Sequence, residues 1–298
     1  MRNIIGLISF IGYVINTLFW FIPIFTFSFL KLIPIAPWQT FISYFIDSCA
    51  TAWVTLNNVN QRLTSNTQWD VAGVETLQLK DWYLVIANHR SWVDILVLQR
   101  VFNRKIPFLK FFLKKELIWV PFLGLAWWAL DFPFMQRYKK SFLAKNPHLK
   151  GKDLETTRKA CEKFQFKPVS VMNFVEGTRF TDGKHAHQKS PFEHLLKPKA
   201  GGIAFVLDAM QSNLHKIVDV TIYYPQGIPS FWEFVCGNVH TVQVRVTTRS
   251  ITELKEQGVI ATDYFNNKDE RVVFQRWLNK IWHEKDQVIK ELPDISKP

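Results

Sequence analysis

The sequence predicts an α/β fold with a mostly parallel or mixed sheet flanked by helices, preceded by an N-terminal membrane-embedded helical segment. Three observations predict it. The first 50 residues are strongly apolar, short strand-like runs alternate with helix-like segments after them, and 298 residues that are 48% hydrophobic can bury a large core. We therefore expect residues 1–50 to form membrane anchor helices and residues 51–298 to form an α/β domain that ends in an amphipathic helix.

The N-terminal segment carries no charged residue from Ile4 to Leu30. This run is longer than the apolar core of about 7 to 15 residues in a signal peptide, which argues against a cleaved leader. As one straight helix it would exceed the apolar thickness of a bilayer, and Pro23 predicts a break or kink within it. A second apolar stretch spans residues 32–46. Two shorter helices, lodged in one leaflet or crossing with a kink, fit the segment as well as one span.

Strands and helices are expected to alternate in the body of the chain. Short apolar or alternating runs predict strands at 82–87, 132–135, 169–174, 217–224 and 240–247. Helical periodicity predicts helices at 91–102, 153–164, 201–210 and 270–292. Apolar side chains recur at helical spacing in the last of these, and we expect that helix to pack on the core rather than lie on the membrane.

The charge and the aromatic content predict an anionic partner. Lys and Arg number 37 against 25 Asp and Glu, a formal charge of +12, and Phe, Trp and Tyr make up 15% of the chain. An anionic membrane and a nucleic acid both suit such a chain. The sequence shows neither a basic recognition helix nor an aromatic RNA-binding strand, so we expect membrane lipids as partners and no nucleic acid.

Asn88 to Asp94 is the candidate catalytic segment, since it joins the strand at 82–87 to the helix at 91–102. Ligands of open α/β folds bind at this carboxyl end of the strands. On one helix His89 and Asp94 would point about 140° apart. If His89 lies in the preceding turn, the carboxylate can accept a hydrogen bond from one ring nitrogen, and the other nitrogen can act as a base. Ser91 is expected to cap the helix rather than to act as a nucleophile.

Four segments together resemble a known family. NHRSWVD (88–94) is similar to the His-x4-Asp motif of the glycerolipid acyltransferase superfamily, typified by the 1-acyl-sn-glycerol-3-phosphate acyltransferases. WVPFLGLAWWALDFPFMQR (119–137), FVEGTR (174–179) and VTIYYP (220–225) look like its other three blocks, in the same order. Longer stretches resemble a bacterial inner-membrane branch of the superfamily. Two positions depart from the usual pattern, with Val175 in place of Pro and Phe180 in place of Ser.

The resemblance implies an active site. His89 would be the general base and Asp94 would orient its ring, for direct acyl transfer without an acyl-enzyme. Arg179 would bind the acceptor phosphate on the turn formed by Gly177 and Thr178, Glu176 would orient Arg179 or a substrate hydroxyl, and Arg137 would supply a second cation. We expect no metal and no resident cofactor. The nearby histidines lack carboxylate or Cys partners at ligand spacing and are expected to lie in a solvated loop: His185, His187 and His194.

The implied reaction joins a fatty acyl group from acyl-CoA or acyl carrier protein to a lysophospholipid acceptor, 1-acyl-sn-glycerol-3-phosphate, giving phosphatidic acid. The aromatic stretch 108–134 would line a groove for the acyl chain. Other acceptors remain open, namely another lysophospholipid or a lipid A precursor, as does a non-catalytic membrane lipid-binding protein. The expected location is the bacterial inner membrane, with the catalytic domain on the cytoplasmic side, where anionic lipids attract a basic protein.

Overall fold

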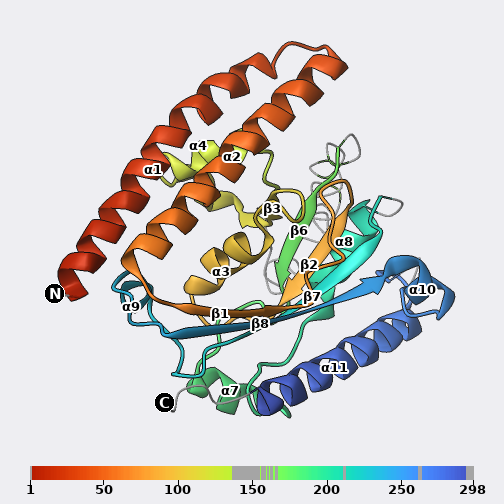
Figure 1. The fold of residues 1–298 in the computed structure, drawn as a ribbon. Coiled ribbons are helices and arrows are strands. Elements are labelled where there is room, and N and C mark those ends of the chain that lie inside the picture. The colour runs from red at the N-terminus through yellow and green to blue at the C-terminus, as the bar shows by residue number, and fades with distance from the viewer. Residues whose placement is uncertain are drawn as a thin grey trace.

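The computed structural model describes residues 2–135, 155, 159, 161, 164, 167–210, 213–260 and 264–292. Two long antiparallel helices lie along one side of an α/β domain built on a twisted sheet (Figure 1). The helices are α1 (Arg2–Leu30), α2 (Ala36–Thr64), α3 (Val93–Phe102), the 3-10 helix η1 (Lys115–Trp119), α4 (Leu123–Ala129), α7 (Asp182–Gln188), α8 (Ala200–Met210), α9 (Phe231–Val235), α10 (Ile251–Glu256) and α11 (Lys268–Glu291).

The main sheet has six strands in the order β1-β8-β7-β2-β6-β3. Neighbouring strands are parallel except β7 and β8, which are antiparallel, so the predicted mixed sheet is confirmed. A separate parallel pair joins β4 and β5. The strands are β1 (Gln68–Ala72), β2 (Tyr83–Ala87), β3 (Leu109–Phe111), β4 (Leu113–Lys114), β5 (Phe134–Met135), β6 (Ser170–Phe174), β7 (Lys216–Tyr223) and β8 (Thr241–Ser250).

Helices cover both faces of this sheet. Leu84 and Ile86 of β2 join the apolar cluster that contains α8 and α11, while Val85 faces the cluster that contains α3. Every residue of β2 is buried, as expected for a central strand covered on both sides. His89 is the second residue after β2, so the catalytic candidate lies at the carboxyl end of this buried central strand.

Of the break or kink expected at Pro23, the break does not occur. The helix α1 has 29 residues and continues through the proline, and the chain turns only at residues 31–35. A proline inside a helix removes one backbone hydrogen bond and its ring crowds the carbonyl of residue i−4. Packing of α1 against α2 and α4 accounts for the continuation, since Ile24, one residue beyond the proline, is buried in their shared apolar cluster. Among the described helices α1 alone is long and apolar enough to cross a membrane.

The boundary expected at residue 50 falls inside α2, which is a single helix of 29 residues. Its first half is apolar, and Ile42 and Ile46 pack in the cluster shared with α4. Its second half contacts α1 through polar side chains: Asn16 donates to Asn57 at 2.8 Å, and Gln61 donates to the Tyr13 hydroxyl at 2.6 Å. The change in composition near residue 50 is therefore a change in what α2 contacts, not the end of the helix.

The C-terminal helix packs on the core, as predicted. Phe274, Leu278 and Trp282 of α11 are buried in the cluster that covers one face of the sheet. Most of the helix expected at 153–164 lies outside the described residues.

Candidate active site

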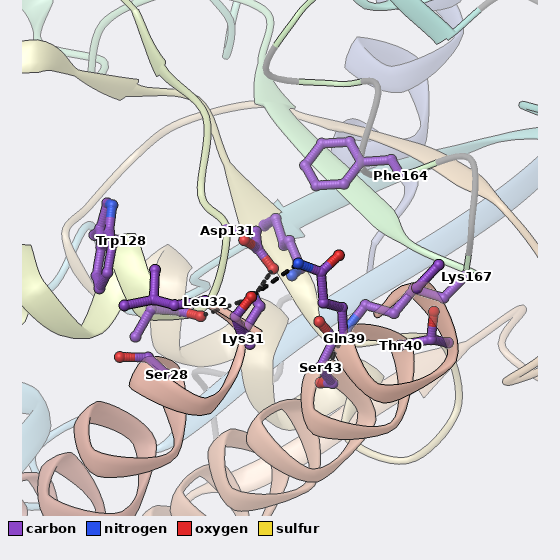
Figure 2. Close-up of a pocket in the computed structure, with 13 residues that line it drawn as sticks. Ser28, Lys31, Leu32, Gln39, Thr40, Ser43, Trp128, Asp131, Phe164 and Lys167 are labelled. Carbon is purple, nitrogen blue, oxygen red and sulfur yellow. Dashed lines mark hydrogen bonds and ion pairs between the residues drawn. The ribbon is translucent and has the colours of Figure 1, made fainter. Parts of the chain in front are cut away.

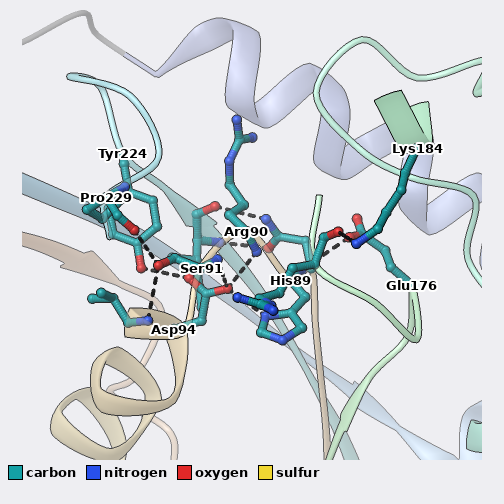
Figure 3. A network of polar contacts seen from close by, with 12 residues as sticks. His89, Arg90, Ser91, Asp94, Glu176, Lys184, Tyr224 and Pro229 are labelled. Atoms are coloured by element: carbon teal, nitrogen blue, oxygen red, sulfur yellow. Dashed lines mark hydrogen bonds and ion pairs between the residues drawn. The ribbon is translucent and has the colours of Figure 1, made fainter. Parts of the chain in front are cut away.

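His89 lies in the turn after β2 and Asp94 in the first turn of α3, the arrangement that lets the two side chains meet. His89 Nδ1 is 2.9 Å from Asp94 Oδ2 (Figure 3). Asp94 is fully buried, whereas 13% of the His89 side chain is exposed. The pair is therefore anchored in the protein interior and reaches the surface at the imidazole ring.

Asp94 is held by four hydrogen bonds. Its Oδ2 accepts from His89 Nδ1 and from the backbone N–H groups of Arg90 at 2.6 Å and Ser91 at 2.9 Å. Its Oδ1 accepts from the Tyr224 hydroxyl at 2.7 Å. A carboxylate that accepts from Nδ1 fixes the tautomer in which Nε2 carries the lone pair. The geometry therefore leaves Nε2 of His89 as the ring nitrogen that can accept a proton.

Two aromatic residues complete the surroundings of this pair. Burial and the neighbouring Asp94 carboxylate raise the pKa of Tyr224 well above its usual value, so its hydroxyl stays a donor. The His89 ring stacks on Phe174 with centroids 3.8 Å apart and an interplanar angle of 12°. These contacts leave the imidazole little freedom to rotate away from Asp94.

Glu176 is not at the mouth of the site. Its side chain is 1% exposed, and its two carboxylate oxygens accept the backbone N–H groups of His89 at 3.3 Å and Leu196 at 3.2 Å. Burial raises the pKa of this carboxyl to about 8, against the opposing effects of those hydrogen bonds and of Arg90. The structure thus shows Glu176 holding the loop that carries His89. The expected role in orienting Arg179 or a substrate hydroxyl stays a prediction.

The turn after β6 presents Arg179 beside the catalytic loop. Gly177 has φ +68°, a left-handed conformation that favours glycine, and it is exposed. The Phe180 N–H donates to the His89 carbonyl at 2.7 Å, which ties the two loops together. The exposed Arg179 guanidinium lies over the Trp92 ring at 4.5 Å. Thr178 Oγ1 accepts from Lys184 Nζ at 2.8 Å (Figure 3). Arg137 lies outside the described residues.

Sequence reasoning missed three residues of this site. Tyr224 binds Asp94, and Lys184 contacts the turn at 177–179. Arg90, next to His89, donates to the His194 carbonyl at 3.1 Å and lies over the rings of Phe180 and Tyr223. The signal for Tyr224 was its place in VTIYYP, one of the four family-like blocks, and the signal for Arg90 was its place within NHRSWVD.

Other polar candidates have structural partners. The Ser91 hydroxyl donates to the Pro229 carbonyl and accepts from the Val93 N–H, consistent with a local capping role. His185 Nε2 lies 2.6 Å from the Phe192 carbonyl oxygen. Within the described residues no group of three or more His, Cys, Asp or Glu side chains is arranged to hold a metal ion.

Aromatic rings lead from His89 into the stretch expected to line a groove. Phe174, which stacks on His89, is followed by Phe111 at 6.4 Å and Phe132 at a further 6.3 Å. A cavity of about 310 Å³ lies beyond them, between α4 and the turn that joins α1 to α2 (Figure 2). Its lining includes Lys110, which is 1% exposed and paired with Asp47 of α2.

Comparisons with known proteins agree with this geometry. The family model described as Acyltransferase matches residues 68–225. Lysocardiolipin acyltransferase 1 of Gallus gallus is 24% identical over 290 residues, covering 90% of this chain and 68% of that protein. The 1-acyl-sn-glycerol-3-phosphate acyltransferase 3 of Arabidopsis thaliana is 28% identical over 217 residues, covering 65% of this chain and 54% of that protein. This chain thus spans little more than half of the plant protein.

A solved structure has the same fold. The crystal structure of the 1-acyl-sn-glycerophosphate acyltransferase PlsC from Thermotoga maritima aligns with a TM-score of 0.57, over 98% of both chains. Sequence identity across this alignment is 16%. The likeness therefore extends over the two long helices as well as the sheet.

Proposed function

The chain belongs to the acyltransferase family, within the glycerolipid acyltransferase superfamily, and we propose that it transfers a fatty acyl group from an acyl thioester to the sn-2 hydroxyl of 1-acyl-sn-glycerol-3-phosphate, giving phosphatidic acid. The observation that carries the proposal is the pairing of His89 with the buried Asp94 at the carboxyl end of β2. Several relatives are named for this acceptor, which supports the choice.

The mechanism uses the acceptor hydroxyl as the nucleophile. His89 Nε2 removes its proton as the oxygen attacks the thioester carbonyl, and Asp94 stabilises the imidazolium that forms. The carbon–sulfur bond then breaks, and the departing thiolate takes the proton from His89. No acyl-enzyme forms, because the attacking oxygen belongs to the substrate. The hydroxyl of Ser91, which is nearby, is bound to the Pro229 carbonyl instead.

Arg179 is proposed to bind the acceptor phosphate. Its guanidinium uses one flat face on Trp92, which leaves its N–H edge for bidentate hydrogen bonds to phosphate oxygens. Arg179 follows the turn at Gly177 and Thr178 and directly precedes Phe180. Because the Phe180 N–H donates to the His89 carbonyl, Arg179 lies beside the loop that carries His89. Glu176 supports this site because its carboxylate accepts the backbone N–H of His89. Arg137 stays a prediction as the second cation.

The acyl chain is proposed to lie along the ring surface formed by Phe174, Phe111 and Phe132, within the aromatic stretch 108–134. The donor is an acyl thioester of coenzyme A or acyl carrier protein, which share the same reacting bond, and no resident cofactor is part of the proposal. We further propose that the protein acts at the cytoplasmic side of a bacterial inner membrane. The apolar helix α1 and the net charge of +12 support this location.

His89→Ala in the purified full-length protein tests the chemistry. Removal of the base should lower the rate of acyl transfer to 1-acyl-sn-glycerol-3-phosphate by about 10²- to 10⁴-fold, measured in detergent with both kinds of donor. His240→Ala is the matched control, because His240 is exposed and precedes β8 outside the site. Turnover of His89→Ala equal to that of the control would exclude the mechanism.

A second acceptor is favoured by one observation. Lysocardiolipin acyltransferases of Gallus gallus and Danio rerio match 90% and 81% of this chain, as extensively as the probable 1-acyl-sn-glycerol-3-phosphate acyltransferase 5 of Arabidopsis thaliana, which matches 88%. A panel of acceptors, including lysophosphatidic acid, monolysocardiolipin and a lipid A precursor, would decide between them. Activity on another acceptor without activity on lysophosphatidic acid would replace the first choice. Inactivity on the whole panel, with retained lipid binding, would favour a non-catalytic lipid-binding protein.

A further inference from the structure

A second cavity lies away from His89, where α1, the end of α2 and the edge of the sheet meet. It has a volume of about 90 Å³, and its lining comes from α1, α2, α3, α9, β1 and the segment that leads into β1. Two arginines line it, Arg62 from the last turn of α2 and Arg100 from α3, together with Gln61 and five hydroxyl-bearing side chains. None of the lining side chains that the structure describes is a carboxylate.

In the part of the chain that the structure describes, Arg100 is fixed in this cavity with no carboxylate bound to it. Its Nη1 donates to Gln61 Oε1 at 2.9 Å, and its guanidinium lies over the Trp69 ring at 4.3 Å. Burial and the positive charge of Arg62 both lower the pKa of Arg100, so the two arginines repel each other across the cavity. Asp70, the residue after Trp69 in β1, points to the other face of the sheet and binds Arg245 through both carboxylate oxygens.

The remaining polar groups suit an anion. Gln61 Nε2 donates to the Tyr13 hydroxyl oxygen at 2.6 Å, so the Tyr13 proton points elsewhere and can be donated. The cavity, at about 90 Å³, is well above the volume of about 10–15 Å³ that one water molecule needs, so a group larger than a single water can enter. Two guanidinium groups and hydroxyl donors are the usual partners of phosphate oxygens in proteins.

An exposed apolar stripe on α2 ends beside Arg62. Leu56, Val59 and Leu63 are 46%, 41% and 81% exposed and recur at helical spacing, so they share one face. Leu63 is the neighbour of Arg62. Beside α2 lies α1, whose outer surface is also apolar, with Ile4, Ile8 and Ile11 exposed (Figure 1). Apolar surface that ends at paired cations matches the division of a phospholipid into acyl chains and phosphate.

We propose that this cavity binds the phosphate of a membrane phospholipid, held by the guanidinium groups of Arg62 and Arg100, with the acyl chains lying along Leu56, Val59 and Leu63. The site is separate from the candidate active site. No residue of the catalytic loop or of the 176–179 turn lines it, and Arg100 is six residues along α3 from Asp94, about 9 Å. The bound lipid would fix how α1 and α2 meet the bilayer.

The test measures binding of dihexanoyl phosphatidylglycerol, a soluble phospholipid, to the full-length protein by isothermal titration. All proteins carry Arg179→Gln, which weakens phosphate binding at the candidate acceptor site. We expect the added double substitution Arg62→Gln and Arg100→Gln to raise Kd at least about tenfold. The matched control, Arg104→Gln with Lys105→Gln, removes the same charge from the exposed surface after α3 and should leave Kd unchanged.

Three further measurements distinguish the alternatives. Arg100→Lys keeps the charge, and its Kd should lie within about threefold of that of the parent protein. Weak binding by the glutamine variant but not by the lysine variant would then be due to the lost charge and not to unfolding. If every Arg100 variant unfolds, Arg62→Gln alone should show the weakened binding. Dihexanoylglycerol, which lacks phosphate, should not bind. Equal Kd values in the double variant and the control would overturn the proposal. Inorganic phosphate binding as tightly as the phospholipid would overturn it too, because the cavity would then be a site for a soluble anion.

Discussion

Glu176 joins the two loops that form the candidate active site. It bonds the His89 and Leu196 backbones, and its pKa of about 8 keeps it largely protonated in the folded protein at neutral pH. In an unfolded chain a glutamate titrates near pH 4.3. Between these two values the folded state binds more protons than the unfolded state, so this residue makes the protein less stable as the pH rises.

Glu176→Gln should therefore flatten the pH dependence of stability. In the wild type we expect the thermal unfolding temperature to fall from pH 5 to pH 9 through the titration of Glu176, and the variant lacks this contribution. Glutamine can accept only one of the two backbone N–H bonds, so the variant should also unfold at a lower temperature at pH 5. Unfolding in detergent at several pH values measures both effects. All other titratable groups are the same in both proteins, so the difference between the curves isolates Glu176, and parallel curves would contradict the expectation.

At the scale of elements, α11 supports the catalytic loop through the backbone of Glu193 and His194. Asp286 accepts the backbone N–H groups of Glu193 at 3.0 Å and His194 at 2.8 Å. The His194 carbonyl in turn accepts from Arg90, next to His89. The sequence predicts only core packing for α11. The structure shows that this helix also holds the segment at 193–196, whose backbone binds Arg90 and Glu176.

Asp286→Ala should lower kcat about tenfold with a smaller change in KM, because the segment at 193–196 would lose two hydrogen bonds and the His89 loop would be less well placed. Asp286→Asn, which can still accept one of them, should recover part of the loss. Glu284→Ala is the control on the same helix, since its partner is Arg249 at the surface. Steady-state kinetics on the best acceptor measure these effects, and a wild-type kcat in Asp286→Ala would show that the contact does not position the site.

At the scale of the whole molecule, charge and apolar surface act together. The net charge of +12 attracts an anionic bilayer at low salt, and exposed side chains on α1, such as Ile15 at 62% and Ile22 at 64%, offer apolar contact. Salt separates the two contributions, because the Debye length falls to about 3 Å at 1 M.

We expect the protein to remain bound to phosphatidylglycerol vesicles in 1 M NaCl, measured by flotation. Ile15→Lys with Ile22→Lys should release it under those conditions, because charged groups on α1 would have to enter the apolar phase. Val272→Lys with Val273→Lys adds the same charge to the exposed face of α11 and should leave binding unchanged. Equal release of the two double variants would argue against α1 as the anchor.

Much of the fold could be predicted from the sequence, because strand and helix periods are local properties. The strands at 82–87, 169–174, 217–224 and 240–247 and the helix at 270–292 were found within a few residues of their positions. The break predicted as one outcome at Pro23 does not occur, since the cost of the proline is outweighed by contacts between α1, α2 and α4 that no local pattern reveals.

The sequence by itself determined the order of the elements and the four family-like blocks, because both follow from local patterns. It predicted that His89 meets Asp94 only if His89 lies in the turn before the helix, and the structure shows that arrangement. Only the tertiary structure decided that the Tyr224 hydroxyl donates to Asp94 and that Glu176 binds the backbone of the His89 loop. It also decided that Asp286 binds the backbone of His194. The physical reason is separation along the chain. Tyr224 lies 130 residues from Asp94, and only the adjacency of β2 and β7 in the sheet brings the ends of those strands to one place.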